Sequence, residues 1–262
     1  SGMRMLYVAM AAAYAGGATI NLIFIRETRP SPAESFNVAY LTRALRQAYS
    51  GIWPLLRSFP APLRALSTVI ILCFISNAVA GPFWVVYATT HIGLSSSEWG
   101  LILLAETGLR NLATIPAGFL TDHYGRCRFI IAALALSLVI PLFVWTGTFA
   151  QVLLIRCIIG LASAFLSPAM GALMADTVPS QTRGRVMAAV GRGSVMMGGA
   201  SGGIGGPGTG YLITGPLVAA SLAGGVLYAW NPVSPFVAVF GLTLLALLVA
   251  FTSMRDPQNA ET

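Results

Sequence analysis

The chain has few charged residues and contains no lysine. Charged residues make up 9% of its 262 positions, whereas soluble domains usually carry about 25%. Hydrophobic residues make up 56%, more apolar surface than a soluble fold of this length can bury, so the composition indicates a polytopic membrane protein. A net charge of +7 favours nucleic-acid binding in a soluble protein, but here we attribute it to arginine-rich cytoplasmic loops. We therefore expect a lipid bilayer, and not nucleic acid, as the partner of this chain.

The small numbers of histidine and cysteine residues and the absence of lysine exclude several kinds of chemistry. The two histidines, His91 and His123, lie far apart in the sequence and do not form the cluster that membrane oxidases use to hold metal. The three cysteines, Cys73, Cys127 and Cys157, have no motif spacing, so we expect free thiols. Without lysine a retinal Schiff base cannot form. We expect no cofactor, no metal site and no enzymatic activity.

Long apolar runs dominate the sequence and predict seven membrane spans, each of about 20 residues. The predicted spans cover residues ~5–25, ~65–89, ~96–120, ~129–149, ~151–174, a broken span within ~184–230, and ~234–253. If the first span runs inward, twelve arginines face the cytoplasm and only Arg4 lies outside. The pattern predicts an all-α, multi-pass protein of the cell (plasma) membrane with a cytoplasmic C-terminus.

Two local patterns refine this outline. Residues 26–64 form a long linker in which Leu41, Leu45 and Ala48 have helical spacing, which predicts an amphipathic helix on the membrane surface; a loosely ordered linker is the alternative. Ser95 and Glu98 have the S-x-x-E spacing of a capping box, so the third span should begin there.

A cluster of charged residues and glycines interrupts the apolar sequence after the third predicted span. It has the pattern G-x-x-x-D-x-x-G-R, formed by Gly118, Asp122, Gly125 and Arg126, with Arg128 shortly after. This pattern resembles the loop signature of the major facilitator superfamily of transporters. We expect it to form a tight cytoplasmic loop between two spans.

A second stretch, LIRCIIGLASAFLSPAMGALMADTVPSQTRGRVMA, resembles the fourth helix of one half of that fold and the loop after it. Arg156 and Gly160 lie in its helical part, and Asp176, Arg183 and Gly184 fall in the predicted loop. The order of motifs implies a major-facilitator-like helical bundle in which this chain supplies about seven transmembrane helices of a twelve-helix fold. The implied organisation is the last helix of the N-terminal half (1–25), a cytoplasmic linker (26–64), a C-terminal six-helix bundle of two inverted three-helix repeats (65–253) and a cytoplasmic tail (254–262).

The resemblance also implies roles for the charged residues. Arg126 should pair with Asp176, and Asp122 should dock on a helix of the missing N-terminal half of the same protein, which holds the outward-facing state together. The implied function is secondary active transport of a small molecule by alternating access, with proton-coupled efflux as one mode; the substrate and the direction stay open. The alternative is a seven-helix membrane receptor or another polytopic protein without transport activity.

Charged and polar residues inside spans are candidates for a substrate or proton pathway, because they are costly in a bilayer. Glu106 and Arg110 lie four residues apart on one predicted helix and can pair there. Arg156, Asn77 and Trp84 are the other candidates. A structural arginine and helix-packing asparagine are the competing interpretations.

A glycine-rich stretch near the sixth span, SGGIGGPGTG, contains G-x-G-x-x-G at Gly203, Gly205 and Gly208. A dinucleotide site needs a preceding strand and an acid about 20 residues later, but no acid occurs between Asp176 and Asp256. We therefore expect a break in the sixth span or a re-entrant turn, and close helix packing through small residues is the alternative.

Overall fold

The computed structural model describes residues 2–24, 59–178, 183–191, 195, 197–199 and 210–254. Their regular structure is helical, without a strand in those ranges. The chain divides into two compact units, Ser1–Gly51 and Ile52–Thr262. The first contains α1 (Gly2–Phe24), and the second contains the other helices that the structure describes. The amphipathic helix predicted around Leu41 and the glycines Gly203, Gly205 and Gly208 lie outside the described residues.

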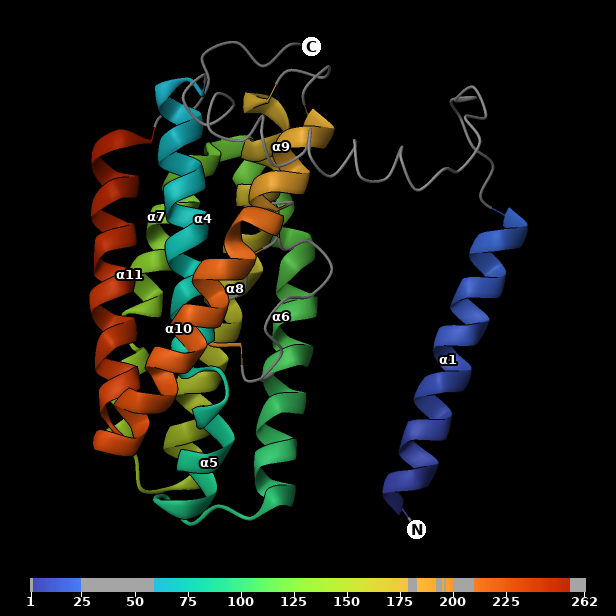
Figure 1. Cartoon of the computed structure of the whole chain (residues 1–262), viewed down its shortest axis with the longest axis vertical. Helices are drawn as coiled ribbons and strands as arrows, with labels where there is room; N and C mark the ends of the chain where they lie inside the picture. Colours follow the sequence, from blue (N-terminus) through green and yellow to red (C-terminus); the bar gives the residue numbers. More distant parts are fainter. Residues whose placement is uncertain are drawn as a thin grey trace. The chain divides into compact units, whose positions relative to one another are not determined.

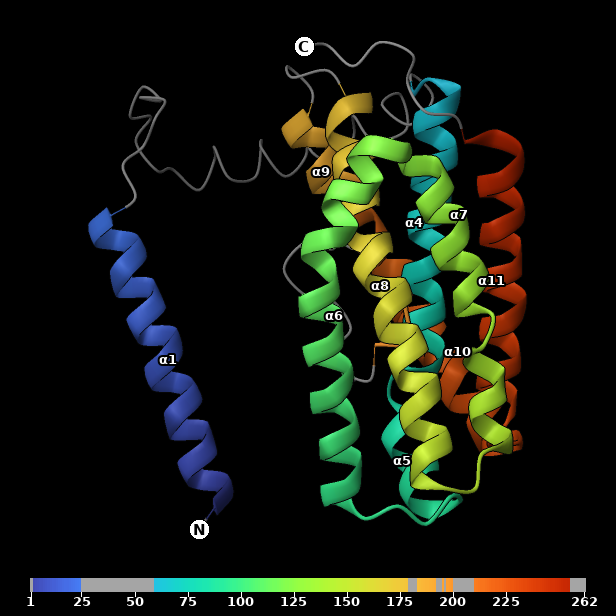
Figure 2. The same ribbon diagram turned by 180° about the vertical axis from the view of Figure 1, so that it is seen from behind.

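The second unit is a bundle whose long helices run up and down along a common axis (Figures 1 and 2). Its elements are α4 (Ala61–Ala80), α5 (Phe83–Thr90), α6 (Ser96–Tyr124), α7 (Arg126–Ser137), the 3-10 helix η1 (Ile140–Trp145), α8 (Phe149–Thr177), α9 (Arg183–Val190), α10 (Tyr211–Trp230) and α11 (Ser234–Ser253). α8 packs between α6 and α7, while α4 packs against α10 and α11. α6 and α8 run in the same direction (Figure 2), so their middles and their C-terminal ends lie at matching levels.

The start of α6 follows directly from its sequence. The Ser95 hydroxyl accepts a hydrogen bond from the Glu98 amide at 3.2 Å, and the Glu98 carboxylate accepts one from the Ser95 amide at 2.8 Å. The two bonds satisfy two of the backbone N–H groups left unpaired at a helix start. The predicted capping box is confirmed.

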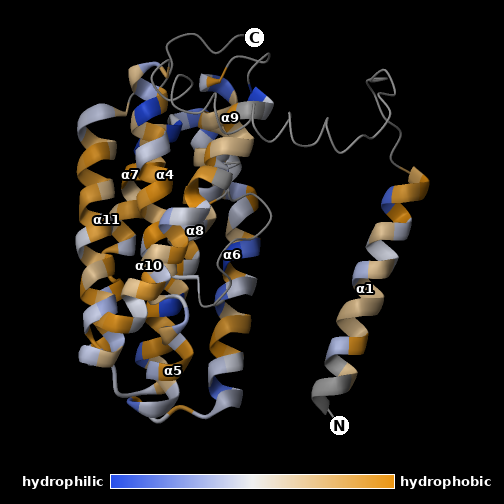
Figure 3. Cartoon of the chain, in the orientation of Figure 1, coloured by the Kyte–Doolittle hydropathy of each residue, from blue (hydrophilic) through white to orange (hydrophobic). Residues whose placement is uncertain are grey.

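Six stretches of the described residues are helical, long enough and apolar enough to cross a membrane: Tyr7–Phe24, Ala61–Thr90, Arg126–Trp145, Phe149–Thr177, Leu212–Trp230 and Ser234–Ser253. The predicted third span, α6, is not among them, although its 29 residues are long enough to cross. Its central Glu106, Arg110 and Asn111 lower its mean hydropathy. Figure 3 shows hydrophilic residues midway along α6, between apolar turns.

Three spans contain interruptions. The span predicted at 129–149 is divided into α7, which ends at Ser137, and the 3-10 helix η1, which begins at Ile140. The span predicted at 65–89 is divided into α4 and α5 at Gly81 and Pro82, where the proline ring cannot donate a backbone hydrogen bond. The sixth span is interrupted, because α9 ends at Val190 and the described residues 191, 195, 197–199 and 210, which precede α10, are not helical; the glycine stretch at which the break was predicted lies outside the described residues. Residues 197–199, which lie between these two helices, pack into the bundle core and contribute to the candidate site.

Candidate functional site

A buried ion pair joins the middle of α6 to α8. Arg156 is 1% exposed and Glu106 is 5% exposed. The guanidinium donates from Nε to Glu106 Oε2 at 2.8 Å, and Nη2 lies 2.5 Å from the same oxygen. The two charges neutralise each other in a region where either one alone carries a large desolvation cost.

The predicted pairing of Glu106 with Arg110 is wrong. Gly160 of α8 explains the difference, because a Cβ atom there would lie 2.9 Å from Glu106 Cγ and 3.0 Å from the Glu106 carbonyl oxygen. The missing side chain lets the two backbones approach closely, and this approach brings Glu106 to Arg156. Arg110 is half-buried and forms no ion pair with any residue that the structure describes.

Aromatic rings surround the Arg156 guanidinium. Its central carbon lies 4.6 Å from the centre of the Trp84 ring and 5.7 Å from that of Trp99, both within the range of cation–π attraction. Trp84 also packs against Phe143 and Phe236, with ring centres 4.6 and 5.2 Å away. These aromatic contacts contribute to the burial of the guanidinium.

A short backbone segment, residues 197–199, completes this site. Arg156 Nη1 donates to the Gly198 carbonyl at 2.7 Å. The Ser163 hydroxyl donates to the Met197 carbonyl at 3.3 Å. The Gly199 amide donates to Asn77 Oδ1 at 3.1 Å. Four of the five sequence candidates for a substrate or proton pathway, Glu106, Arg156, Asn77 and Trp84, thus lie around one core site, and Arg110 stands one turn outside it.

A second charge cluster lies at the C-terminal ends of α6 and α8. Arg126, the first residue of α7, donates to Asp122 Oδ1 from Nη2 at 3.1 Å and from Nε at 3.3 Å. Its Nη1 donates to Asp176 Oδ2. The predicted ion pair between Arg126 and Asp176 is confirmed, and one guanidinium therefore ties together three helices.

The structure corrects the prediction that these residues lie in loops. α6 continues through Gly118 and Asp122 to Tyr124, so Gly125 is the only residue between α6 and α7. Pro116 does not end the helix, since helices that span membranes tolerate proline when neighbouring groups satisfy the freed carbonyl. Gly125 makes the turn with a φ of 94°, a value that favours glycine.

The same correction applies to the second motif. Asp176 lies in the last turn of α8, and Arg183 and Gly184 lie in α9. Arg183 donates from Nη2 to the Val178 carbonyl at 3.4 Å, which holds the start of α9 near the end of α8. Arg128 is exposed on the first turn of α7.

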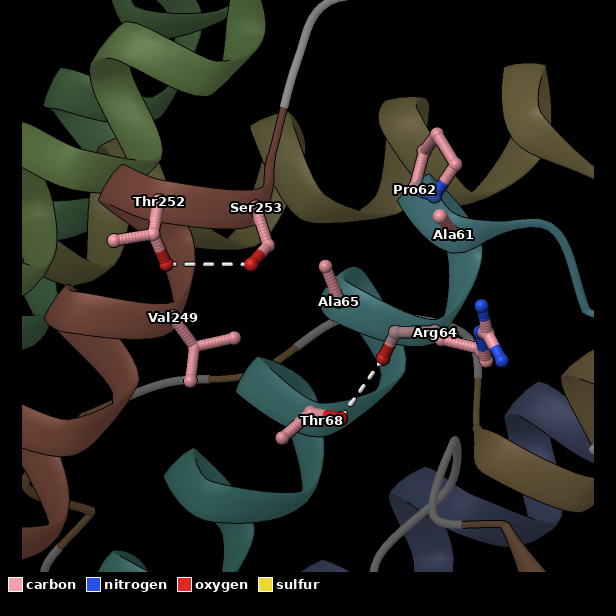
Figure 4. Close-up of a pocket in the computed structure, with 8 residues that line it drawn as sticks. All are labelled: Ala61, Pro62, Arg64, Ala65, Thr68, Val249, Thr252 and Ser253. Atoms are coloured by element: carbon pink, nitrogen blue, oxygen red, sulfur yellow. Dashed lines mark hydrogen bonds between the residues drawn. The ribbon is translucent and has the colours of Figure 1, made fainter.

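A surface cavity of about 670 Å³ lies between the start of α4 and the end of α11 (Figure 4). Its lining residues are Ala61, Pro62, Arg64, Ala65, Thr68, Val249, Thr252 and Ser253. Two of its hydroxyls are engaged with each other, since Thr252 Oγ1 and Ser253 Oγ lie 3.2 Å apart. None of the predicted site residues lines this cavity. Within the described residues, no group of three or more histidine, cysteine or acidic side chains could hold a metal ion.

The sequence model of the Major Facilitator Superfamily matches residues 66–262 of this chain. The chain belongs to the major facilitator superfamily. It is 33% identical over 107 residues to the uncharacterized MFS-type transporter MJ1560 of Methanocaldococcus jannaschii, a match that covers 40% of this chain and 28% of the relative. It is 27% identical over 109 residues to the uncharacterized MFS-type transporter YqjV of Bacillus subtilis, covering 41% and 27%. The chain thus aligns with less than a third of the length of either relative.

For this member of the superfamily, the sequence analysis missed three contributors to the core site: Trp99, Ser163 and residues 197–199. Ser163 follows Arg156 by seven residues, a spacing that places both on one face of α8, so a helical projection could have found it. The glycine-rich stretch predicted a break or a re-entrant turn in this region, but no sequence signal indicated that residues 197–199 would contact that face of α8.

Proposed function

We propose that this chain is the C-terminal portion of a secondary active transporter of the plasma membrane, which moves a small molecule by alternating access. The observation that carries the proposal is the family match over residues 66–262. Both relatives described above are named as transporters, and neither is named as a receptor. The partner of this bundle is then the N-terminal half of the same protein, and the C-terminal tail faces the cytoplasm.

The charge cluster around Arg126 supports a conformational role in this mechanism. Asp122 pairs with Arg126 but keeps 65% of its side chain exposed, whereas Asp176 keeps 31%. A carboxylate at this exposure remains accessible to hydrogen-bond donors of a second bundle, such as the N-terminus of a helix. Arg126 orients it from α7 and is itself held by α8. Docking and release of Asp122 would then stabilise one of the two access states.

The test is a flux measurement on the full-length protein that the complete gene encodes, reconstituted in liposomes with an imposed pH gradient. A library of small molecules is screened for saturable uptake or release. We expect at least one compound to show saturable, gradient-dependent flux, and Asp122→Asn and Arg126→Ala to reduce it strongly. Arg64→Gln removes a charge from the first turn of α4 that forms no ion pair with a described residue, and serves as the matched control.

Folded full-length protein that supports no saturable flux with any compound would contradict the proposal. Equal loss in Arg64→Gln and Arg126→Ala would contradict the conformational role of the cluster while leaving transport in place. The 262-residue chain reconstituted alone should show no saturable flux, and co-expression with an N-terminal half should restore it. Saturable flux from the chain alone would overturn the two-bundle mechanism.

A further inference from the structure

Among the residues that the structure describes, the middle of the bundle carries more positive than negative charge. Away from helix ends, the described spans and α6 contain three charged side chains: Glu106, Arg110 and Arg156. Glu106 is engaged by Arg156 through two nitrogen atoms. One positive charge, on Arg110, is left over. Charged groups at this depth are costly and occur mostly with a counter-charge or facing a water-filled path.

Arg110 occupies a distinctive position on α6. It is the middle residue of the 29-residue helix Ser96–Tyr124, roughly 21 Å from either end at 1.5 Å per residue. The buried residues of α6 are Trp99, Ile102, Glu106, Ala117 and Thr121, spaced three or four positions apart except for eleven positions between Glu106 and Ala117. Position 110 continues this stripe, yet its side chain is only half-buried. The Arg110 side chain therefore lies on this face of α6 without being fully covered by the bundle.

We propose that Arg110 binds the transported molecule and that this molecule is a small organic anion bearing a carboxylate or a phosphate. The inference rests on the proposed transport function. A guanidinium presents a planar fork of donors that matches both anionic groups. Binding of an anion cancels the excess charge in the middle of the bundle, whereas binding of a cation adds repulsion to Arg110.

Binding is tested on the full-length protein in detergent by thermal stabilisation with matched sets of probes. One set is benzoate, benzamide and benzylammonium, which share a ring and differ in charge; phenyl phosphate and short-chain carboxylates and phosphomonoesters form the second. We expect stabilisation by anions and not by the amide or the amine. The carboxylate and phosphate arms show which anionic group is preferred.

Arg110→Gln should weaken anion binding by about tenfold or more, the loss expected when one charge-assisted hydrogen bond is removed. Arg110→Lys keeps the charge without the fork and should retain part of the affinity. Arg64→Gln, on another helix, should bind as the unchanged protein does. If Arg110→Gln does not fold, Arg110→Lys and the charge preference of the unchanged protein carry the test.

Flux separates this inference from the proposed function. Compounds found by the transport screen should be anions, with a KM that rises in Arg110→Gln. If every transported compound is neutral or cationic, the protein is a transporter but the anion site is wrong. If no anion stabilises the protein, or if Arg110→Gln lowers thermal stability without changing anion binding, Arg110 pairs with an acid of the N-terminal half and the inference is overturned.

Discussion

Glu106 and Arg156, fifty residues apart in the sequence, form an ion pair that is almost fully buried between α6 and α8. A pair of this kind is costly to form and much more costly to break, because removal of one partner leaves the other charge buried alone. The pair therefore fixes the relative position of the two helices, and with it the position of Arg110 one turn further along α6.

Glu106→Gln should lower the free energy of unfolding by about 3–5 kcal/mol, because Arg156 remains buried without its counter-charge. The double variant Glu106→Leu with Arg156→Met should be more stable than the sum of the two single changes predicts. Thermal unfolding in detergent measures Glu106→Gln, the single variants Glu106→Leu and Arg156→Met, and the double variant. Glu98→Gln, which keeps a capping side chain at the exposed start of α6, is the control and should change little. Strict additivity of the single changes would contradict the pairing.

Gly160→Ala should destabilise the protein by roughly 1–3 kcal/mol, because the new methyl group overlaps the side chain and backbone of Glu106. The matched control is Gly108→Ala on α6, where no atom lies within 4 Å of a Cβ. Alanine there should stabilise the helix by up to about 1 kcal/mol. The unfolding temperatures of the two variants should move in opposite directions. Similar shifts would mean that α6 and α8 do not approach closely at Gly160.

Asp176→Asn should destabilise the bundle more than Asp122→Asn, because Asp176 is the less exposed of the two carboxylates that bind Arg126. Both effects should stay within about 1 kcal/mol, as is usual for ion pairs near the surface. High salt should reduce the difference by screening. Unfolding temperatures at low and high ionic strength test this order, and a larger effect of Asp122→Asn at low salt would reverse it.

Gly198→Ala should release the segment at residues 197–199 from the bundle. The φ angle of Gly198 is +67° and an added Cβ would lie 2.7 Å from Ile159 Cγ2, so alanine is disfavoured both by its backbone conformation and by contact. Hydrogen exchange at the Gly199 amide, which donates to Asn77, should become faster. Gly147→Ala, with open space around its Cβ position, should leave that exchange rate unchanged. Unchanged protection in Gly198→Ala would show that the segment is held by other contacts.

Much of the fold could be predicted because its signals are local. Apolar runs of span length located the helices, and the predicted span at 234–253 coincides with α11. The capping residues Ser95 and Glu98 are three positions apart, so their geometry is set by the helix start itself. The contact between Arg126 and Asp176 was predicted from the resemblance to a known family. Such a resemblance relates residues that are far apart in the sequence, which local patterns cannot do.

The partner of Glu106 depends on how the helices pack against each other. By sequence alone, Arg110 is its nearest cation on the same helix face, and helical spacing favours that pair. Arg156 displaces it because Gly160 permits two backbones to approach, a condition that depends on how α6 and α8 pack. Sequence patterns therefore located the long helices, whereas the packing of α6 on α8 set which charges are in direct contact and left Arg110 without an ion pair among the described residues. Hydrophobic periodicity and capping act within a few residues, but the choice between two counter-ions depends on the distance across an interface.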